Sequence, residues 1–269
     1  MKPLRAALAG LAVLLAQTAP AQTPPTLSVY AAGSLRAAFT ELARAHEQNT
    51  GVAVRMTFGA SGLLKDRLAG GEVADVFASA NMEHPQALAA AGRGEAVVPF
   101  ARNALCLLGA PGFALQGRTV AQRLLDGDLR VGISTPKADP AGDYAFLLFE
   151  RIESSRAAGP GSAAALKARA LQLTGGPQSP PPPPDRNVYA ALMAEGRADV
   201  FVTYCTNAAL ARREQPTLQV LAIPEAINVA ATYGAIVLRP VSPRAQAFMD
   251  LLLGPQGRAI LAAQGFSSP

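Results

Sequence analysis

The stretch LSVYAAGSLRAAFTEL, residues 27–42, decides the fold because a strand pattern gives way to a helix pattern within it. Residues 27–31 form a short apolar run, Gly and Ser at 33–34 supply a turn, and apolar side chains then recur at helical spacing over 35–45. The same order of strand, turn and helix recurs over residues 52–69. Strands that alternate with helices predict an α/β fold with a mostly parallel sheet.

The second half of the chain restarts this alternation, which predicts a second α/β lobe. Strands are expected over 104–108 and 130–134, and a long helix over 143–154. GEVADVF at 71–77 and GRADVF at 196–201 also share one shape, a helix end that runs into a strand. We interpret the two as one copy in each lobe, with chance similarity in an Ala-rich chain as the alternative.

The end of the chain is expected to return to the first lobe. A strand at 234–238 and a helix at 243–253 then make the chain cross between the lobes more than once, which creates a hinge. The Pro-rich stretch at 175–184 is expected to be an exposed connector. The predicted organisation is a signal peptide at 1–21, a first lobe at 22–101 plus 224–269, and a second lobe at 102–223.

Residues 1–21 have the pattern of a cleaved secretory signal. Lys2 and Arg5 precede an apolar run at 6–16, and the ending TAPA at 18–21 supplies an Ala-x-Ala cleavage site. A membrane anchor needs about 20 apolar residues, and this run is shorter. The mature protein is therefore expected in the periplasm.

The composition excludes several classes of function. Half of the 269 residues are hydrophobic and 16% are charged, which favours a globular chain over a disordered one. The formal net charge is +5, and no stripe of Lys or Arg is interleaved with aromatic residues, so nucleic-acid binding is not expected. Two His and two Cys are too few for a Cys-rich zinc module. We expect a monomer without a bound metal cation or cofactor.

The two cysteines, Cys106 and Cys205, lie in or next to strand-like runs. In an oxidising compartment such a pair forms a disulfide most simply. Two buried thiols are the alternative, because the sequence does not fix the distance between them.

Three turns place a small or hydroxyl residue where a strand gives way to a helix: Ser34, Ser61 and Ala141–Gly142. The N-terminus of a helix carries N–H groups without a helical partner and a partial positive charge, so it binds anions without Lys or Arg. The serines could instead only cap their own helices. In an open α/β sheet such turns gather at the carboxyl edge, where ligands bind. The phenol of Tyr204 and the backbone N–H of Val188 are expected at the same edge.

Four runs carry a resemblance to a known family: VYAAGSL at 29–35, TFGASGL at 57–63, ADVFASA at 74–80 and DPAGDYA at 139–145. In their order and spacing they resemble the periplasmic molybdate-binding proteins of ABC transporters, over nearly the whole mature chain. The resemblance implies a two-lobed clamshell of type II, with each sheet flanked by helices and a hinge between the lobes. It also implies capture of a tetrahedral oxyanion, molybdate and also tungstate, for a membrane permease.

The resemblance implies five ligand-binding residues. They are the hydroxyls of Ser34 and Ser61, the backbone N–H groups of Ala141 and Val188, and the phenol of Tyr204. The family holds its anion with neutral donors of these kinds and without counter-charges.

The chain departs from the family pattern at two places. Asp139 and Asp143 flank the turn at Ala141, and a carboxylate that pointed into an anion site would repel the ligand. We expect Asp143 to face solvent. Residues 205–207, Cys-Thr-Asn, replace the Gly-Ser that many relatives have after the Tyr. Both departures bear on the identity of the ligand more than on the fold.

An enzyme is the main competing class, with Ser61 as a nucleophile. The run at 59–63 has Leu where a nucleophile elbow needs its final Gly. The available bases, His46 and His84, are both expected at the surface and have no partner that suggests a triad. We therefore expect a binding protein rather than a hydrolase. Another oxyanion, a small organic anion, or a periplasmic sensor with the same clamshell are the remaining alternatives.

Overall fold

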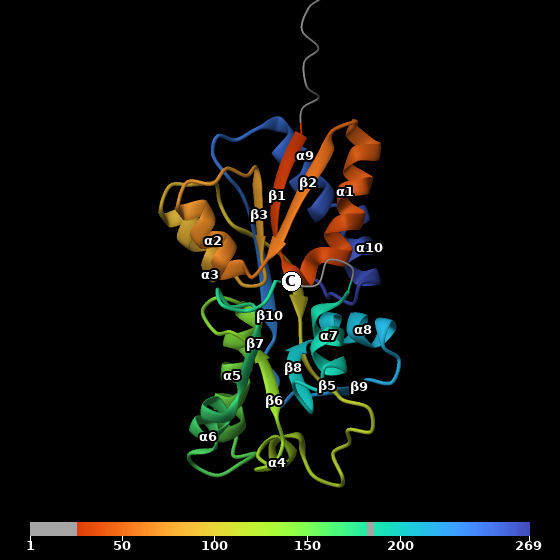
Figure 1. Ribbon diagram of the computed structural model, residues 1–269. Coiled ribbons are helices and arrows are strands. Elements are labelled where there is room, and N and C mark those ends of the chain that lie inside the picture. Colours follow the sequence, from red (N-terminus) through yellow and green to blue (C-terminus); the bar gives the residue numbers. More distant parts are fainter. Residues whose placement is uncertain (1–25, 182–185) are drawn as a thin grey trace, which may run out of the picture.

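The computed structural model describes residues 26–181 and 186–269, which form two lobes stacked end to end (Figure 1). The predicted signal peptide at 1–21 and part of the predicted Pro-rich connector lie outside these residues. Within the described part of the chain, no helix is long and apolar enough to cross a membrane.

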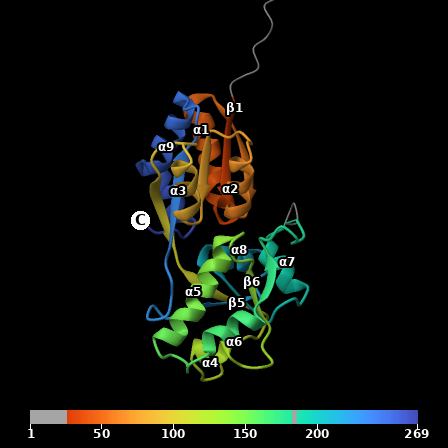
Figure 2. The ribbon, with the colours of Figure 1, turned by 90° about the vertical axis from the view of Figure 1, so that its left-hand side faces the viewer.

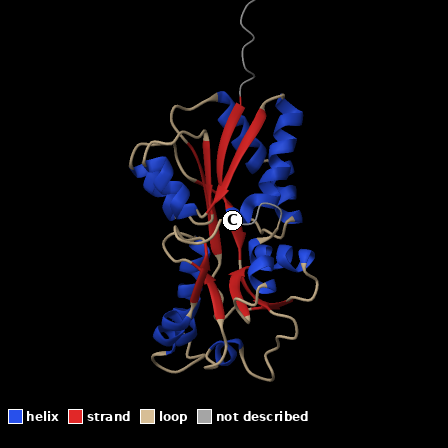
Figure 3. Ribbon diagram, in the orientation of Figure 1, coloured by secondary structure: helices blue, strands red, loops and turns tan. Residues whose placement is uncertain are grey.

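The first lobe is built on a five-stranded sheet with helices on both faces (Figures 1 and 3). The strands lie in the order β2 (Ala53–Gly59), β1 (Thr26–Ala32), β3 (Val76–Ser79), β10 (Ala231–Val237) and β4 (Val98–Asn103). One face carries α2 (Ser61–Ala69) and α3 (Glu83–Ala90); the other carries α1 (Arg36–Thr50), α9 (Pro243–Leu253) and α10 (Pro255–Ala263). A short 3₁₀ turn, η1 (Gly33–Leu35), joins β1 to α1.

The second lobe repeats this plan with a second five-stranded sheet. The strands lie in the order β7 (Leu171–Thr174), β6 (Val131–Ser134), β8 (Val200–Tyr204), β5 (Leu105–Gly109) and β9 (Gln219–Ala222). Its helices are α4 (Val120–Leu124), α5 (Pro140–Ser154), α6 (Ser162–Arg169), α7 (Val188–Ala194) and α8 (Cys205–Glu214). Figure 2 shows α5 and α6 crossing the front of this lobe.

The predicted α/β class and the two sheets are confirmed, but each sheet is mixed rather than mostly parallel. In the first, β1 pairs parallel with β2 and β3, whereas β10 pairs antiparallel with β3 and β4. In the second, β6 pairs parallel with β7 and β8, whereas β5 pairs antiparallel with β8 and β9. The reason is that β5 and β10 each enter a lobe from the other lobe, and so run against the strands that end between the lobes.

The described chain passes between the sheets at two places, from β4 to β5 at Ala104 and from β9 to β10 over residues 223–230. Asn228 joins the two passages, since it accepts from the N–H of Leu105 at 3.2 Å and donates to its C=O at 3.0 Å. The first-lobe strand β4 continues to Asn103, two residues past the expected boundary at 101. These two neighbouring segments are the only direct backbone links between the sheets within the described residues, as expected of a hinge.

A row of aromatic rings, in tilted and edge-to-face contact, runs from one lobe to the other. The ring centroids of Tyr144 and Tyr204 are 6.2 Å apart, those of Tyr204 and Tyr233 are 5.6 Å apart, and Phe100 follows 6.2 Å from Tyr233. Tyr204, on β8, and Tyr233, on β10, are both fully buried. Aromatic pairs at such separations add stability beyond the area that they bury.

Both histidines are buried, so the prediction that they lie at the surface is wrong. His46 is 1% exposed and lies 5.6 Å from the Phe248 ring of α9, measured between centroids. Its charged neighbours Arg44 and Glu47 point to the other face of α1. The charged neighbours of His46 therefore indicate only the exposed face of α1, and His46 lies on the buried face. His84 is 8% exposed, within α3.

Cys106 of β5 and Cys205, the first residue of α8, form a disulfide with their Cα atoms 4.8 Å apart. The ladder explains their proximity, because Leu105 pairs with Tyr204 and Cys106 pairs with Thr203. Of the two alternatives for these cysteines, the structure has the bridge.

Candidate functional site

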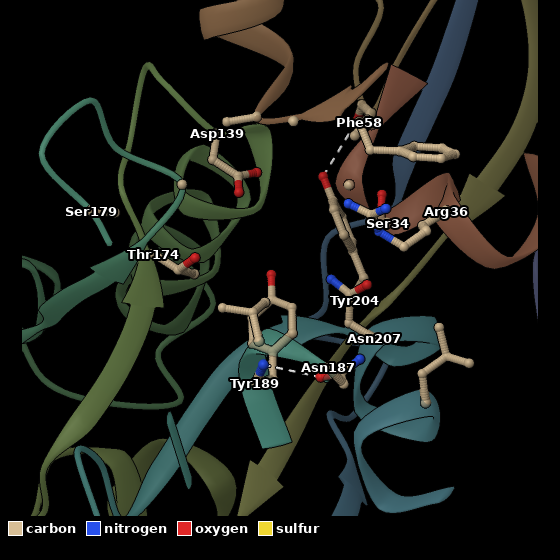
Figure 4. Close-up of a pocket in the computed structure, with 18 of the residues that line it drawn as sticks. Ser34, Arg36, Phe58, Asp139, Thr174, Ser179, Asn187, Tyr189, Tyr204 and Asn207 are labelled. Atoms are coloured by element: carbon tan, nitrogen blue, oxygen red, sulfur yellow. Dashed lines mark hydrogen bonds between the residues drawn. The ribbon is translucent and has the colours of Figure 1, made fainter. Parts of the chain in front are cut away.

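A cleft of about 760 Å³ lies where the carboxyl ends of strands from both sheets face each other. Four of the five predicted ligand-binding residues line it: Ser34, Ser61, Val188 and Tyr204. Figure 4 shows side chains from both lobes around this space. Ala141, the fifth, is not among the lining residues.

Ser61 is the first residue of α2 and is 1% exposed. Its Oγ accepts a hydrogen bond from the N–H of Ala80 at 3.1 Å, and Ala80 directly follows β3. The hydroxyl therefore keeps its own hydrogen for a further partner. Ser61 does not cap its own helix, because Ala60 is the N-cap and has no side-chain cap bond. The capping alternative for Ser61 is thus not what the structure has.

Ser34 is held by a chain of hydrogen bonds that begins at Asn103, the last residue of β4. The Nδ2 of Asn103 donates to the phenol oxygen of Tyr233 at 3.3 Å, and that phenol lies 2.9 Å from the Oγ of Ser34. The phenol is fully buried and Ser34 is the acceptor next to it, so we assign the phenol hydrogen to Ser34, which leaves the hydrogen of the serine for the cleft. Asn103 also donates to Thr206 of the second lobe at 2.8 Å, so the chain extends across the hinge.

Tyr204 donates its phenol hydrogen to the backbone oxygen of Ala80 at 3.3 Å (Figure 4). This hydrogen bond joins the second lobe to the first. The same phenol hydrogen was predicted to bind an anion. Tyr204 can therefore donate to a ligand only after its bond to Ala80 breaks. Burial raises the pKa of this phenol well above its usual value, and it is neutral at physiological pH.

The backbone N–H of Ala141 is occupied by Asp139, whose Oδ1 accepts from it at 3.0 Å. The sequence placed Ala141 in a turn before the helix, but α5 begins at Pro140, with Asp139 as its N-cap. Asp and Pro favour these two positions, so the helix starts three residues earlier than predicted. Ala141 consequently lies inside the first helical turn and not at the cleft.

The two aspartates beside this turn behave differently. Asp139 lines the cleft, and burial raises its pKa to about 6. Asp143 does not line it; it accepts from the N–H of Lys137 at 2.7 Å and stabilises that residue's left-handed conformation, φ 69°. Asp143 is half-buried rather than solvent-facing as predicted, because this bond holds it against the turn.

Val188 is the first residue of α7, and it lines the cleft beside Asn187. The side chain of Asn187 caps the helix, accepting from the N–H groups of Tyr189 at 3.0 Å and Ala190 at 3.1 Å. The cap therefore satisfies the second and third N–H groups of the helix and does not engage the first, that of Val188.

Arg36 is a cleft residue that the sequence analysis missed. It is the first residue of α1, two positions after Ser34, and its guanidinium lies 4.6 Å from the centroid of the Phe58 ring. Figure 4 shows it beside Ser34. Its position directly after the turn at Gly33 and Ser34 could have predicted it. The resemblance instead implied a site with neutral donors and no counter-charge. A cation at this end of the cleft favours an anionic ligand.

The described residues contain no group of three or more His, Cys, Asp or Glu placed to hold a metal ion. None of the described residues that line the cleft is a histidine, so Ser61 has no imidazole base there. The chemistry that this arrangement supports is the binding of a small anion by hydroxyl and N–H donors.

A family model described as "bacterial extracellular solute-binding protein" matches residues 27–267. The chain belongs to this family of solute-binding proteins. It is 40% identical over 208 residues to uncharacterized protein PM1146 of Pasteurella multocida, covering 77% of this chain and 85% of that protein. It is 29% identical over 256 residues to the molybdate-binding protein ModA of Mycobacterium tuberculosis, covering 93% of this chain and 87% of that protein.

A solved structure with the same fold is the sulfate-binding protein SubI of Mycobacterium tuberculosis. Its TM-score is 0.75 at 18% identity, with 91% of this chain and 87% of that chain covered. As a solute-binding protein, this chain is not an enzyme. It acts outside the cytoplasm and binds a small solute.

Proposed function

We propose that this solute-binding protein captures a tetrahedral oxyanion, molybdate and also tungstate, in the cleft between its lobes. The observation that carries the proposal is the direction of two hydroxyl groups. Ser61 accepts from the N–H of Ala80, and Ser34 is assigned as the acceptor of the Tyr233 phenol, so each can present a hydrogen to the cleft. Paired donors at the starts of two helices suit an anion.

Each of these hydrogen bonds to a charged ligand is worth roughly 1.5 to 3 kcal/mol in a water-excluded cleft. The N–H of Val188 is the third donor in this proposal, and Tyr204 joins when it leaves Ala80. Ala141 would contribute only if Asp139 released it. The ModA relative, at 29% identity over 93% of this chain, supports molybdate as the ligand to test first.

In the proposed mechanism the anion binds one lobe and the other lobe closes over it. Two contacts across the cleft suit such closure: the N–H of Gly62 donates to the backbone oxygen of Ala138 at 2.9 Å, and Tyr204 donates to Ala80. We propose the expected lobes, 22–101 plus 224–269 and 102–223, with the first boundary moved to Asn103, where β4 ends. The closed form, a periplasmic monomer released by cleavage after residue 21, would then dock on a membrane permease.

A small organic anion is the second candidate. The cleft of about 760 Å³ lies within the range of about 300–1,000 Å³ typical of sites for organic ligands. In addition, the carboxylate of Asp139 faces the cleft, which the neutral-donor pattern does not explain. A periplasmic sensor with the same clamshell has no observation of its own in its favour.

Thermal melting of residues 22–269 tests the proposal, with molybdate, tungstate, sulfate and phosphate added separately. A ligand that binds only the folded protein raises the midpoint with the logarithm of its concentration. The proposal predicts a rise with molybdate and tungstate. If none of the four anions moves the midpoint, an oxyanion is not the ligand.

A further inference from the structure

The cleft extends beyond the two serines into a part that the proposed oxyanion contacts leave unused. Asp139, Thr174 and Tyr189 line this part, from the start of α5, the end of β7 and the start of α7 (Figure 4). In the close-up, the carboxylate of Asp139 and the hydroxyl of Tyr189 point into the same space. A ligand that filled only the anion end would not contact this polar wall.

The carboxylate of Asp139 is held in place from two sides. Its Oδ1 accepts from the N–H of Ala141 at 3.0 Å. On the other side lies Gly175, with φ 77°, where an added Cβ would come within 2.4 Å of the carboxylate Oδ2. Only glycine lets the chain pass so close in this conformation. The carboxylate is therefore fixed, with the cleft as its open side.

A fixed carboxylate affects different ligands in opposite ways. It repels a bare dianion such as molybdate, which has no hydrogen to donate. A ligand hydroxyl, by contrast, donates to it and forms a charge-assisted hydrogen bond. At the opposite end, Arg36 and the serine hydroxyls suit a negative group. The cleft thus has one end for an acid group and one for a hydrogen-bond donor.

We infer that Asp139 is a specificity-determining residue and that the ligand is a phosphate ester of a hydroxylated carbon chain. Its phosphate lies between Ser34 and Ser61, and a hydroxyl donates to Asp139. This inference deepens the second candidate function, a small organic anion, and it rests on the proposed function only in placing a tetrahedral anionic group on the two serines. The volume of about 760 Å³ leaves room for the carbon chain that joins the two groups.

The charge states of the surrounding groups agree with this assignment. Burial raises the pKa of Asp139 to about 6, so at pH 7.5 the carboxylate is mostly ionised and accepts hydrogen bonds. The nearby Asp143 carboxylate contributes to the rise. The phenols of Tyr189 and Tyr204 remain neutral, because burial raises both of their pKa values.

The test compares two phosphate esters that differ only in their hydroxyls, glycerol 3-phosphate and propyl phosphate, with molybdate as a third ligand. Affinities are measured by titration calorimetry at pH 7.5 for the wild type and for Asp139→Asn. Asn keeps the side-chain oxygen that caps α5, so the variant is expected to fold. Asp143→Asn is the matched control, since it removes an equal charge four residues away that does not line the cleft.

The inference predicts that the wild type binds glycerol 3-phosphate about tenfold or more tightly than propyl phosphate. Asp139→Asn should reduce this preference to a few-fold and strengthen molybdate binding, whereas Asp143→Asn should change neither. Equal binding of the two esters, or a preference that survives in Asp139→Asn, would overturn it. Molybdate binding alone, unchanged in Asp139→Asn, would refute this inference and leave the proposed function standing. Binding of none of the three ligands would refute both.

Discussion

The hydrogen bonds around Ser34 and Ser61 leave both hydroxyl hydrogens available to a ligand, with Ser34 assigned as the acceptor of its bond to Tyr233. Ser61 accepts from the N–H of Ala80, and Ser34 accepts from Tyr233, which in turn accepts from Asn103. Neither serine has to give up an existing hydrogen bond to donate to a ligand. Preset donors of this kind bind without the cost of reorganising the site.

The phenol of Tyr233 should matter for binding although it does not line the cleft. Tyr233→Phe removes the donor that satisfies Ser34, so the serine hydroxyl is no longer oriented, and we expect anion affinity to fall by about five- to twentyfold. Titration calorimetry measures the effect. Tyr30→Phe is the control, because its phenol pairs with Glu72 at 2.6 Å, outside the cleft. Equal affinity in both variants would contradict the role given to Tyr233.

Asp139 should make stability depend on pH in a known direction. Its folded pKa of about 6 lies above its ordinary value of 3.8, so the folded protein is penalised once the carboxylate ionises. The free energy of unfolding is therefore highest, with respect to this group, below pH 4. It falls by up to about 3 kcal/mol as the pH rises through 6. Asp139→Asn should therefore be more stable than the wild type at pH 8 and not at pH 4, by urea unfolding. A difference that does not vary with pH would refute the assignment.

At the scale of elements, the close approach of α2 and the turn before α5 brings the lobes together. Gly62, in the first turn of α2, donates to Ala138, and an added Cβ would lie 2.5 Å from the backbone oxygen of Lys137. Backbone atoms cannot move aside as a flexible side chain can. The second position of this helix therefore has to be glycine for the lobes to meet.

Gly62→Ala should hold the lobes apart and weaken ligand binding by about tenfold or more, with little loss of stability. Small-angle scattering should show a larger radius of gyration for the ligand-saturated variant than for the wild type. Gly127→Ala is the control, because an added Cβ there meets nothing within 4 Å. A variant that closes and binds normally would contradict this account of closure.

The disulfide joins β5 to α8 across a sequence separation of 99 residues. Opening it in the double variant Cys106→Ala, Cys205→Ala should cost about 2–4 kcal/mol of unfolding free energy, because it frees a long loop of the unfolded chain. Ligand affinity should stay within a few-fold, since neither cysteine lines the cleft. Denaturant unfolding and calorimetry check the two parts. Unchanged stability would show that the bridge does not stabilise the fold.

The elements with periodic patterns were predictable, and those whose partners are distant in sequence were not. Helix α5 was expected over 143–154 and runs over Pro140–Ser154. Helix α8, CTNAALARRE, has too few apolar residues to show a period, and it is held by packing on β5 and by the disulfide. The short strands β7 and β9 likewise depend on their neighbours in the sheet. The same limit applied to the site, where the partners Tyr233 and Ala80 lie far along the chain from the serines they hold.

At the scale of the whole molecule, two lobes face a common cleft and are joined by two adjacent backbone segments and a row of aromatic rings. Of the five residues that the resemblance implied, four line that cleft. Tyr204 bridges the lobes, Asp139 occupies the N–H of Ala141, and the two serines are the donors that we propose for the anion. In our proposal the serines hold the anion, and residue 139 determines which anion fits.

The most direct test of the central claim, that Ser34 and Ser61 hold an anion in the cleft, is titration calorimetry of the double variant Ser34→Ala, Ser61→Ala against the wild type. The ligand is whichever anion raises the melting temperature of the wild type. The control is Ser154→Ala, Ser155→Ala, at the end of α5 and away from the cleft. We predict one ligand per chain for the wild type and the control, and a loss of about a hundredfold or more in the cleft variant. Equal affinity in all three proteins would contradict the account.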